Sequence, residues 1–156
     1  MSLHTTAGCT QPQGVTQTGT QATTNCDYSQ NGNSGCIVQD SNTASYGAAF
    51  AQAGGGVWVT EFAETGINIW FFSVRNLPPH SVLAQMIYSI AQRPNVPSAL
   101  STNSVDTSAL GTPSATYPAS SCNPTTHFTK QQIVIDLKLC GVWCAPLPLT
   151  SDDSFL

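Results

Sequence analysis

Charged side chains are scarce in this sequence of 156 residues. Asp, Glu, Lys and Arg make up 8% of it, against roughly 25% in an ordinary soluble domain. The only Lys and Arg residues are Arg75, Arg93, Lys130 and Lys138, and the net charge is −4. So few cations cannot neutralise a run of phosphates or an anionic membrane surface. We therefore expect a neutral partner, with no nucleic acid and no membrane.

Long apolar segments are missing as well. No uninterrupted apolar run reaches the length of about 18 residues that a membrane-spanning helix needs. The opening letters, MSLHTTAGCT, lack the basic and then apolar segments of a secretory signal peptide. The length is that of one domain, or of part of one, and we expect a monomer.

Paired carboxylates are a third absence. Two acids that act together from one strand must share a face, as in E-x-D or D-x-E. The sequence contains no such pair among its eight acids: Asp27, Asp40, Glu61, Glu64, Asp106, Asp136, Asp152 and Asp153. Glu61 and Glu64 lie at an odd offset, and we interpret them as a strand residue and a turn residue. No catalytic residue is predicted.

Other catalytic and metal-binding patterns are also missing. No Ser or Cys lies in a nucleophile elbow, and the three histidines are scattered. We expect His80 to be exposed and His127 to be a loop residue. No Cys and His residues have zinc-like spacing. We therefore expect neither a metal nor an organic cofactor.

Cysteine and neutral polar residues are abundant instead. Six cysteines (Cys9, Cys26, Cys36, Cys122, Cys140 and Cys144) in so polar a chain are typical of an oxidising compartment. Cys9 directly precedes residues 10–45, and Cys26 and Cys36 lie within this tract, which is rich in Thr, Gln, Asn, Ser and Gly. This tract is either a disordered linker or a set of polar loops ordered by cross-links.

Three segments have the pattern of β-strands. Val57–Phe62 and Ile67–Phe72 are β-branched and aromatic runs on either side of a short turn, which predicts a hairpin. Gln132–Leu139 alternates apolar and polar residues, which predicts a third strand. Strands joined by polar, Gly- and Pro-rich connections predict an all-β antiparallel sandwich or jelly roll. One isolated helical stripe lies in residues 79–92.

The three tryptophans could stack on sugar rings or fill a core. We interpret Trp58 and Trp70 as core residues because they lie in predicted strands. For Trp143, which lies between cysteines at the end of the third predicted strand, both alternatives stay open.

Several strings together resemble the fungal endo-1,3(4)-β-glucanases, the laminarinase branch of glycoside hydrolase family 16. They are SLHTTAGCTQP, TTNCDYSQNGNSGC, SYGAAFAQAGGGVWVTEF, TGINIWFF, NVPSAL, GTPSATYPASSC and HFTKQQIVIDLKLCGVW, and they cover most of residues 2–73 and 93–143. The resemblance implies an incomplete concanavalin-like jelly roll from a secreted enzyme. It also implies retaining hydrolysis of β-1,3 or mixed β-1,3/1,4 glucans outside the cell, with β-glucan polysaccharide as the partner.

The resemblance also carries expectations for individual residues. The family's catalytic strand, a pattern like E-I-D-I-x-E, precedes the segment that matches SLHTTAGC, so we expect its three acids to be absent. His4 matches a histidine that lines the glycan cleft. Trp143 matches the tryptophan of a C-G-D-W-A-G motif near that cleft, although Val142 and Cys144 depart from the motif. His4 and Trp143 are therefore the candidate substrate-binding residues.

Further expectations concern cross-links and boundaries. We predict a Cys122–Cys140 disulfide, because both cysteines fall in matched segments and the bond would close a short loop, and we predict an unpaired Cys144. Residues 74–92 interrupt the resemblance and are predicted to be an insertion or an unspliced intron. Residues 144–156 form an unmatched tail. The alternative to a glucanase fragment is a non-catalytic domain that binds glucan or cell-wall material.

Overall fold

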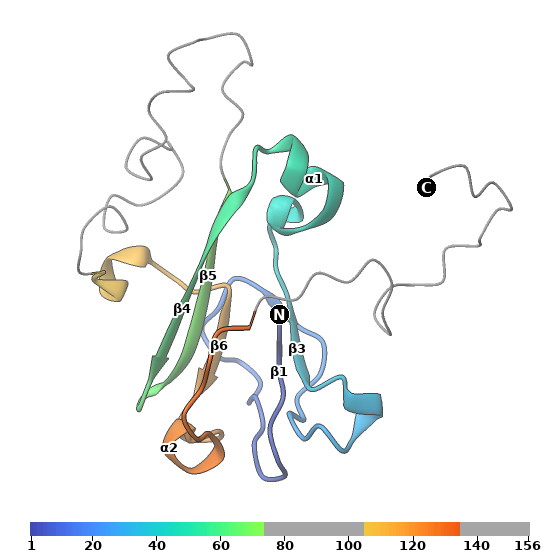
Figure 1. The fold of residues 1–156 in the computed structure, drawn as a ribbon, viewed down its shortest axis with the longest axis vertical. Helices are drawn as coiled ribbons and strands as arrows, with labels where there is room; N and C mark the ends of the chain where they lie inside the picture. Colours follow the sequence, from blue (N-terminus) through green and yellow to red (C-terminus); the bar gives the residue numbers. More distant parts are fainter. Residues whose placement is uncertain (74–104, 135–156) are drawn as a thin grey trace, which may run out of the picture.

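The computed structural model describes residues 1–73 and 105–134. Its strands form two three-stranded antiparallel sheets, of order β1-β3-β2 and β4-β5-β6 (Figure 1). The strands are β1 (Ser2–Leu3), β2 (Thr20–Gln21), β3 (Cys36–Gln39), β4 (Gly56–Ala63), β5 (Gly66–Ser73) and β6 (Ala115–Pro118). The helices are all short: η1 (Asn31–Asn33), η2 (Thr43–Ser45), α1 (Gly47–Gln52), η5 (Thr107–Leu110) and α2 (Pro124–His127). The predicted all-β antiparallel class is confirmed.

Strands β4 and β5 form the predicted hairpin. They pair along their whole length, with Val57 opposite Phe72 and Phe62 opposite Ile67. Each strand is one residue longer at both ends than predicted. Gly66 follows the turn with a φ of 143°, and a Cβ there would lie 2.6 Å from the carbonyl oxygen of Tyr117. Only glycine fits this position without strain.

The polar tract of residues 10–45 is ordered. It contains β2 and β3, and a disulfide joins Cys26 to Cys36. Gln11, only 1% exposed, donates from Nε2 to the carbonyl oxygen of Thr116 at 2.8 Å and to Oε1 of Gln17 at 2.9 Å. Since buried amides must be hydrogen-bonded, these contacts explain how a segment with few apolar residues folds. The tract is therefore a set of polar loops ordered by cross-links, and not a disordered linker.

Strand β6 joins the two sheets. The backbone N–H of Gly19 donates to the carbonyl oxygen of Ser114 at 2.9 Å, and a Cβ on Gly19 would lie 2.5 Å from that oxygen. The buried Tyr117 hydroxyl donates to the carbonyl oxygen of Cys36 at 3.3 Å. The core between the sheets consists of Cys9, Cys26, Cys36, Val38, Ile67, Ala115, Tyr117 and Cys122.

The predicted Cys122–Cys140 disulfide is wrong, because Cys122 is bonded to Cys9. The two Cα atoms lie 4.5 Å apart although 113 positions separate them in the sequence. A backbone hydrogen bond of 3.1 Å from Thr10 to Ser121 holds the two segments together. The prediction favoured a short loop, whereas the fold brings Cys122 to a cysteine that is distant in the sequence. Cys140 and Cys144 lie outside the described residues.

Three further predictions need correction. Trp58 is 42% exposed, because its position on β4 faces a groove instead of the opposing sheet. Ile133 and Val134 begin the predicted strand Gln132–Leu139, but they lie in no strand and are 95% and 80% exposed. An alternating pattern forms a strand only where a partner strand is available, and the rest of this segment lies outside the described residues. His127 ends helix α2 and is not a loop residue.

Candidate functional site

His4 lies on an exposed surface directly after β1. Its Nδ1 is 3.1 Å from Oδ1 of Asn33 in helix η1. Gly35 lies beneath the ring with a φ of +66°, and a Cβ there would come within 3.1 Å of the same Nδ1. The hydrogen bond and the close backbone fix the ring's orientation and leave Nε2 without an assigned partner. Trp143, the other predicted binding residue, lies outside the described residues, as does His80.

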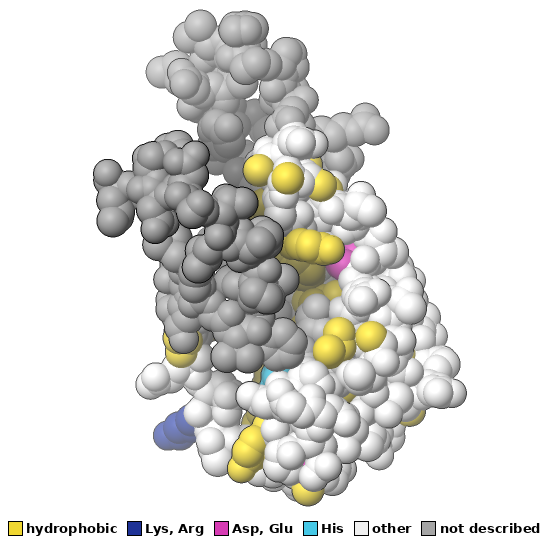
Figure 2. Space-filling view, turned by 90° about the vertical axis from the view of Figure 1, so that its right-hand side faces the viewer, with side chains coloured by type: hydrophobic (Ala, Val, Ile, Leu, Met, Phe, Trp, Pro, Cys, Tyr) yellow, Lys and Arg dark blue, Asp and Glu magenta, His cyan; other side chains and the backbone are white. Residues whose placement is uncertain are grey.

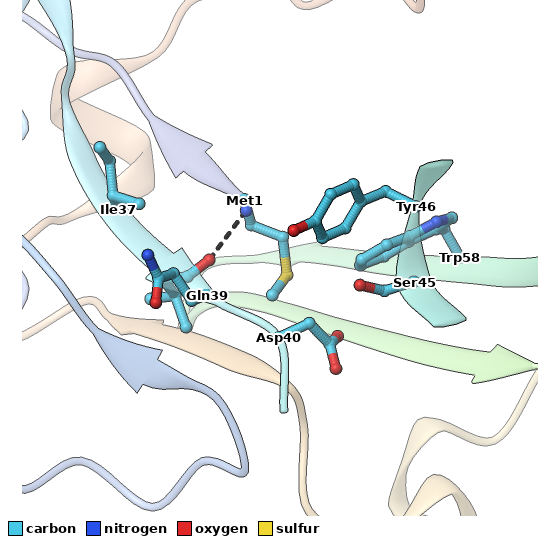
Figure 3. Close-up of a pocket in the computed structure, with 8 residues that line it drawn as sticks. Met1, Ile37, Gln39, Asp40, Ser45, Tyr46 and Trp58 are labelled. Atoms are coloured by element: carbon cyan, nitrogen blue, oxygen red, sulfur yellow. Dashed lines mark hydrogen bonds between the residues drawn. The ribbon is translucent and has the colours of Figure 1, made fainter. Parts of the chain in front are cut away.

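A separate groove opens between β3 and β4, and we call it the aromatic groove. Its volume is about 460 Å³, within the range of roughly 300 to 1,000 Å³ typical of small-molecule sites. Figure 3 shows its lining, which consists of Met1, Ile37, Val38, Gln39, Asp40, Ser45, Tyr46 and Trp58.

Two successive turns form one wall of the aromatic groove. Asp40 follows β3, and its Oδ1 accepts a hydrogen bond of 2.8 Å from the backbone N–H of Asn42. The side chain of Asn42 then accepts one of 2.9 Å from the N–H of Ala44 and caps helix η2. Asp and Asn favour such turns because their short side chains bond to the backbone two residues on. The turns bring Ser45 and Tyr46 opposite β4.

The aromatic rings of this groove are open to solvent. Trp58 is 42% exposed and Tyr46 is 79% exposed. The Trp58 ring packs against Phe71, its partner on β5, with a centroid distance of 4.7 Å and an angle of 43° between the rings. Trp70 differs: it is 5% exposed and its indole N–H donates to the carbonyl oxygen of Gly111 at 2.9 Å. The core interpretation is therefore confirmed for Trp70 only.

Asp40 also presents an unpaired acceptor. Its Oδ2 is buried and has no hydrogen-bond partner among the described residues. In Figure 3 the carboxylate points toward Ser45 and the ring of Trp58. Figure 2 shows acidic atoms in a hollow beside exposed hydrophobic side chains, on a face of mostly neutral atoms. Sequence reasoning missed Asp40 and Tyr46, and the only available signal was the turn-forming letters DSN before the tyrosine.

Of the two neighbouring glutamates, Glu61 is held by hydrogen bonds. Glu61 on β4 accepts hydrogen bonds from the Thr107 hydroxyl and, at 2.9 Å, from the Asn68 amide. These bonds hold the pKa of Glu61 below its ordinary value, with the Thr107 bond as the larger cause. Glu64 is exposed at the hairpin turn. The two side chains thus occupy the strand and turn positions expected from the sequence.

Residues 1–73 and 105–134 contain neither a metal-binding cluster nor a membrane-spanning helix. No group of three or more His, Cys, Asp or Glu side chains there could hold a metal ion. Over the same residues, no helix has the length and apolar character needed to cross a membrane.

The sequence matches a known family over nearly its whole length. Residues 1–90 and 83–154 match the family model described as an XgeA-like, catalytic GH16 domain. The chain belongs to glycoside hydrolase family 16. Its two antiparallel sheets are thus part of the family's jelly roll.

Curated relatives from fungi support this assignment. The chain is 32% identical to an endo-1,3(4)-β-glucanase of Arthroderma benhamiae, over 91% of this chain and 28% of the relative. It is 33% identical to a probable glycosidase, C21B10.07, of Schizosaccharomyces pombe, over 92% of this chain and 30% of the relative. The chain therefore spans less than a third of the length of these relatives.

Solved structures of the family are also similar. Laminarinase 16A from Phanerochaete chrysosporium, with two β-glucans in its donor and acceptor sites, superposes with a TM-score of 0.64 and 33% identity. The match covers 83% of this chain and 38% of that one. An elongating GH family 16 β-1,3-glucosyltransferase gives a TM-score of 0.63 and 29% identity, over 83% of this chain and 36% of that one.

Proposed function

We propose that this chain is the part of an extracellular β-glucan hydrolase that contributes substrate binding and lacks the catalytic carboxylates. The family match over residues 1–90 and 83–154 carries the proposal. It is supported by the relatives named as endo-1,3(4)-β-glucanases and by the laminarinase that holds β-glucans. The substrate class is β-1,3 or mixed β-1,3/1,4 glucan. The two disulfides fit an oxidising, extracellular location.

His4 is the described residue that we assign to the glucan. Its ring is exposed and is oriented by Asn33. A neutral imidazole offers one donor and one acceptor, so the nitrogen that does not face Asn33 is available to a sugar hydroxyl. Trp143 is the second residue assigned, from the family motif alone.

Affinity electrophoresis tests the binding role of His4. Migration of the full chain should slow in gels that contain laminarin or lichenan, and should be unchanged in gels that contain the α-glucan pullulan. His4→Ala should weaken the retardation about fivefold, in line with the loss of one hydrogen bond worth about 1 kcal/mol. His127→Ala, which changes the other described histidine, serves as the matched control. Equal migration with and without β-glucan would refute the proposal.

Hydrolysis by this chain should be absent. Retaining hydrolysis needs two carboxylates about 5 to 5.5 Å apart, and the sequence has no E-x-D or D-x-E pair. Reducing-sugar release from laminarin or lichenan should equal that of a mock preparation. Release above the mock level that persists in every acidic variant, including Glu61→Gln, would point to a contaminant. Release that is lost when one acidic residue is replaced would overturn this part of the proposal.

A non-catalytic glucan-binding domain is the second candidate, and the exposed aromatic groove favours it. Both candidates bind glucan, so binding does not separate them. The genomic sequence immediately upstream of the Met1 codon separates the two candidates. An in-frame E-x-D-x-x-E pattern there supports the hydrolase, and its absence supports the binding domain.

We also propose that residues 74–92 are an insertion relative to the family. Its support is the resemblance of the strings on either side of the segment. Removing residues 74–92 joins two strings that fit the family, WFFS and RPNVPS. Sequencing of transcripts decides between an unspliced intron, which would be missing from most transcripts, and an encoded insertion, which would be present in all.

A further inference from the structure

We propose that Asn31 is a site of spontaneous covalent modification, at which the asparagine is converted to aspartate and isoaspartate through a cyclic imide. Asn31 and Gly32 lie in helix η1, within the loop that the Cys26–Cys36 disulfide closes. The reaction requires only water, and the site does not depend on the proposed hydrolase function.

The reaction joins the backbone nitrogen of Gly32 to the side-chain carbon Cγ of Asn31. The nitrogen gives up its proton, the new N–Cγ bond forms and the Cγ–Nδ2 bond breaks, so that Nδ2 leaves as ammonia. Water then opens the cyclic imide. Cleavage of the N–Cγ bond gives aspartate, whereas cleavage of the bond between the same nitrogen and the backbone carbonyl carbon gives isoaspartate, in which the chain runs through Cγ. Asparagine is thermolabile in proteins.

The attacking nitrogen of Gly32 is accessible. Gly32 is exposed, and no described residue accepts a hydrogen bond from its N–H. A Cβ on Gly32 would meet no atom within 4 Å. The carbonyl oxygen of Asn31, in the same peptide group, accepts hydrogen bonds from the Ser34 N–H at 3.2 Å and from the Ser34 hydroxyl at 2.7 Å. Because hydrogen bonds polarise the groups they join, both bonds favour loss of the Gly32 proton.

The side-chain amide of Asn31 is free to react. Asn31 is exposed, and no hydrogen bond to another described residue involves its side chain. Gly32, with a φ of +61°, has the conformational freedom that closure of the imide ring demands. Neither reacting group therefore has to give up a contact before the ring forms.

Asn33, two residues further on, is held in a different way. It is also exposed, but its Oδ1 lies 3.1 Å from Nδ1 of His4. The next backbone N–H, that of Ser34, donates to the carbonyl oxygen of Asn31. Both reacting groups of Asn33 are therefore engaged. The remaining asparagines of the described part of the chain each have a hydrogen-bonded side chain: Asn25, Asn42, Asn68 and Asn123. The structure thus selects Asn31.

Modification of Asn31 would alter the support of His4. Isoaspartate adds one carbon to the backbone between residues 31 and 32. The turn bonds of η1 span this point, from the Asn33 N–H to the Gln30 carbonyl oxygen at 3.0 Å and from the Ser34 N–H to that of Asn31. A longer backbone changes both bonds, so Asn33 moves relative to the His4 ring. The reaction also adds one negative charge to this surface.

Peptide mapping of the full chain after storage at mildly alkaline pH tests the site. An endoproteinase that cleaves before aspartate releases residues 27–39 from the reduced protein, since Asp27 and Asp40 bound this stretch. Fragmentation in the mass spectrometer should place a gain of about one dalton, from the exchange of NH2 for OH, at position 31 and not at position 33. Aspartate at position 31 creates a new cleavage site and isoaspartate does not, so the two products are distinguished. Asn31→Gln should remove the gain.

The same chain, reduced and unfolded in urea, separates the effect of the fold from that of the Asn-Gly sequence. Asn31 should react at a comparable rate in both states. Asn33 should react about tenfold or more slowly in the folded chain than in the unfolded one, because its two contacts must break first. If folding protects Asn31 as strongly as Asn33, or if Asn33 reacts first in the folded chain, the proposal is overturned.

Laminarin gels test the link to His4, which rests on the proposed function. The fresh chain should be retarded, and the fraction that contains isoaspartate should be retarded less, by up to about fivefold as for His4→Ala. Equal retardation of the two would overturn the link to His4. A fresh chain that is not retarded at all would refute the proposed function, while the peptide map would still decide whether Asn31 is the modified residue.

Discussion

Removing the Cys9–Cys122 disulfide should lower the free energy of unfolding far more than removing Cys26–Cys36. A cross-link stabilises a protein mainly by reducing the entropy of the unfolded chain, and the effect grows with the length of the loop it closes. The sequence separations are 113 and 10, for which the loop-entropy relation gives ~4.8 and ~2.7 kcal/mol. The predicted difference is therefore about 2 kcal/mol.

Urea unfolding of two paired variants measures this difference. Cys9→Ala with Cys122→Ala is compared with Cys26→Ala and Cys36→Ala, since alanine introduces no buried hydroxyl into sites that are 0% to 1% exposed. All four cysteines are buried in the same core, so the packing losses are similar and largely cancel in the comparison.

Peptide mapping of the unreduced protein checks the pairing itself. It should yield a cross-linked peptide pair that contains Cys9 and Cys122. If removing Cys26–Cys36 costs as much as removing Cys9–Cys122, the loop-entropy reasoning is wrong. If the map instead joins Cys122 to Cys140, the contact between the segment of Cys9 and Thr10 and the segment of Ser121 and Cys122 is wrong.

Three further predictions concern single residues. Tyr117→Phe should lower the free energy of unfolding by about 1 kcal/mol, because it removes the donor to the carbonyl oxygen of Cys36; an unchanged urea midpoint would contradict this. Gln11→Ala should cost more, about 2 to 3 kcal/mol, because it leaves buried backbone and side-chain groups unpaired; the same urea assay measures it, and a smaller loss than for Tyr117→Phe would count against the glutamine network. Glu61 has a depressed pKa in the folded state, so its contribution to stability is present above pH about 4.5 and is lost as pH falls through the folded pKa. Glu61→Gln should therefore reduce the pH dependence of the free energy of unfolding below pH about 4.5. The same pH dependence in the variant and the original protein would show that the Thr107 contact has no energetic effect.

Local patterns predicted the hairpin well. Val57–Phe62 and Ile67–Phe72 are β-branched and aromatic segments joined by four residues, and the information needed to pair them is contained within one short stretch. Trp70 was also predictable as a core residue from its strand. Trp58, on the neighbouring strand with the same pattern, differs only in what lies opposite, which depends on the turns that follow β3.

Long-range contacts were beyond local patterns. No spacing rule connects Cys9 to Cys122, because the Thr10–Ser121 and Gly19–Ser114 hydrogen bonds that bring them together depend on the whole fold. The aromatic groove was missed for the same reason. Its members Asp40 and Trp58 come from segments that have no common sequence signal, and Asp40 was counted only as an acid without a catalytic partner.

The position of β6 also has a consequence for biosynthesis. Cys9 is made early, but its partner Cys122 follows 113 residues later. At a synthesis rate of roughly 5 to 20 residues per second, the Cys9 thiol waits roughly 6 to 23 seconds after its own synthesis before Cys122 is made. During that interval Cys26 and Cys36 are already available and can pair with it. An early Cys26–Cys36 bond leaves Cys9 free for Cys122, whereas an early bond from Cys9 to either of them must be exchanged before the native pairs can form.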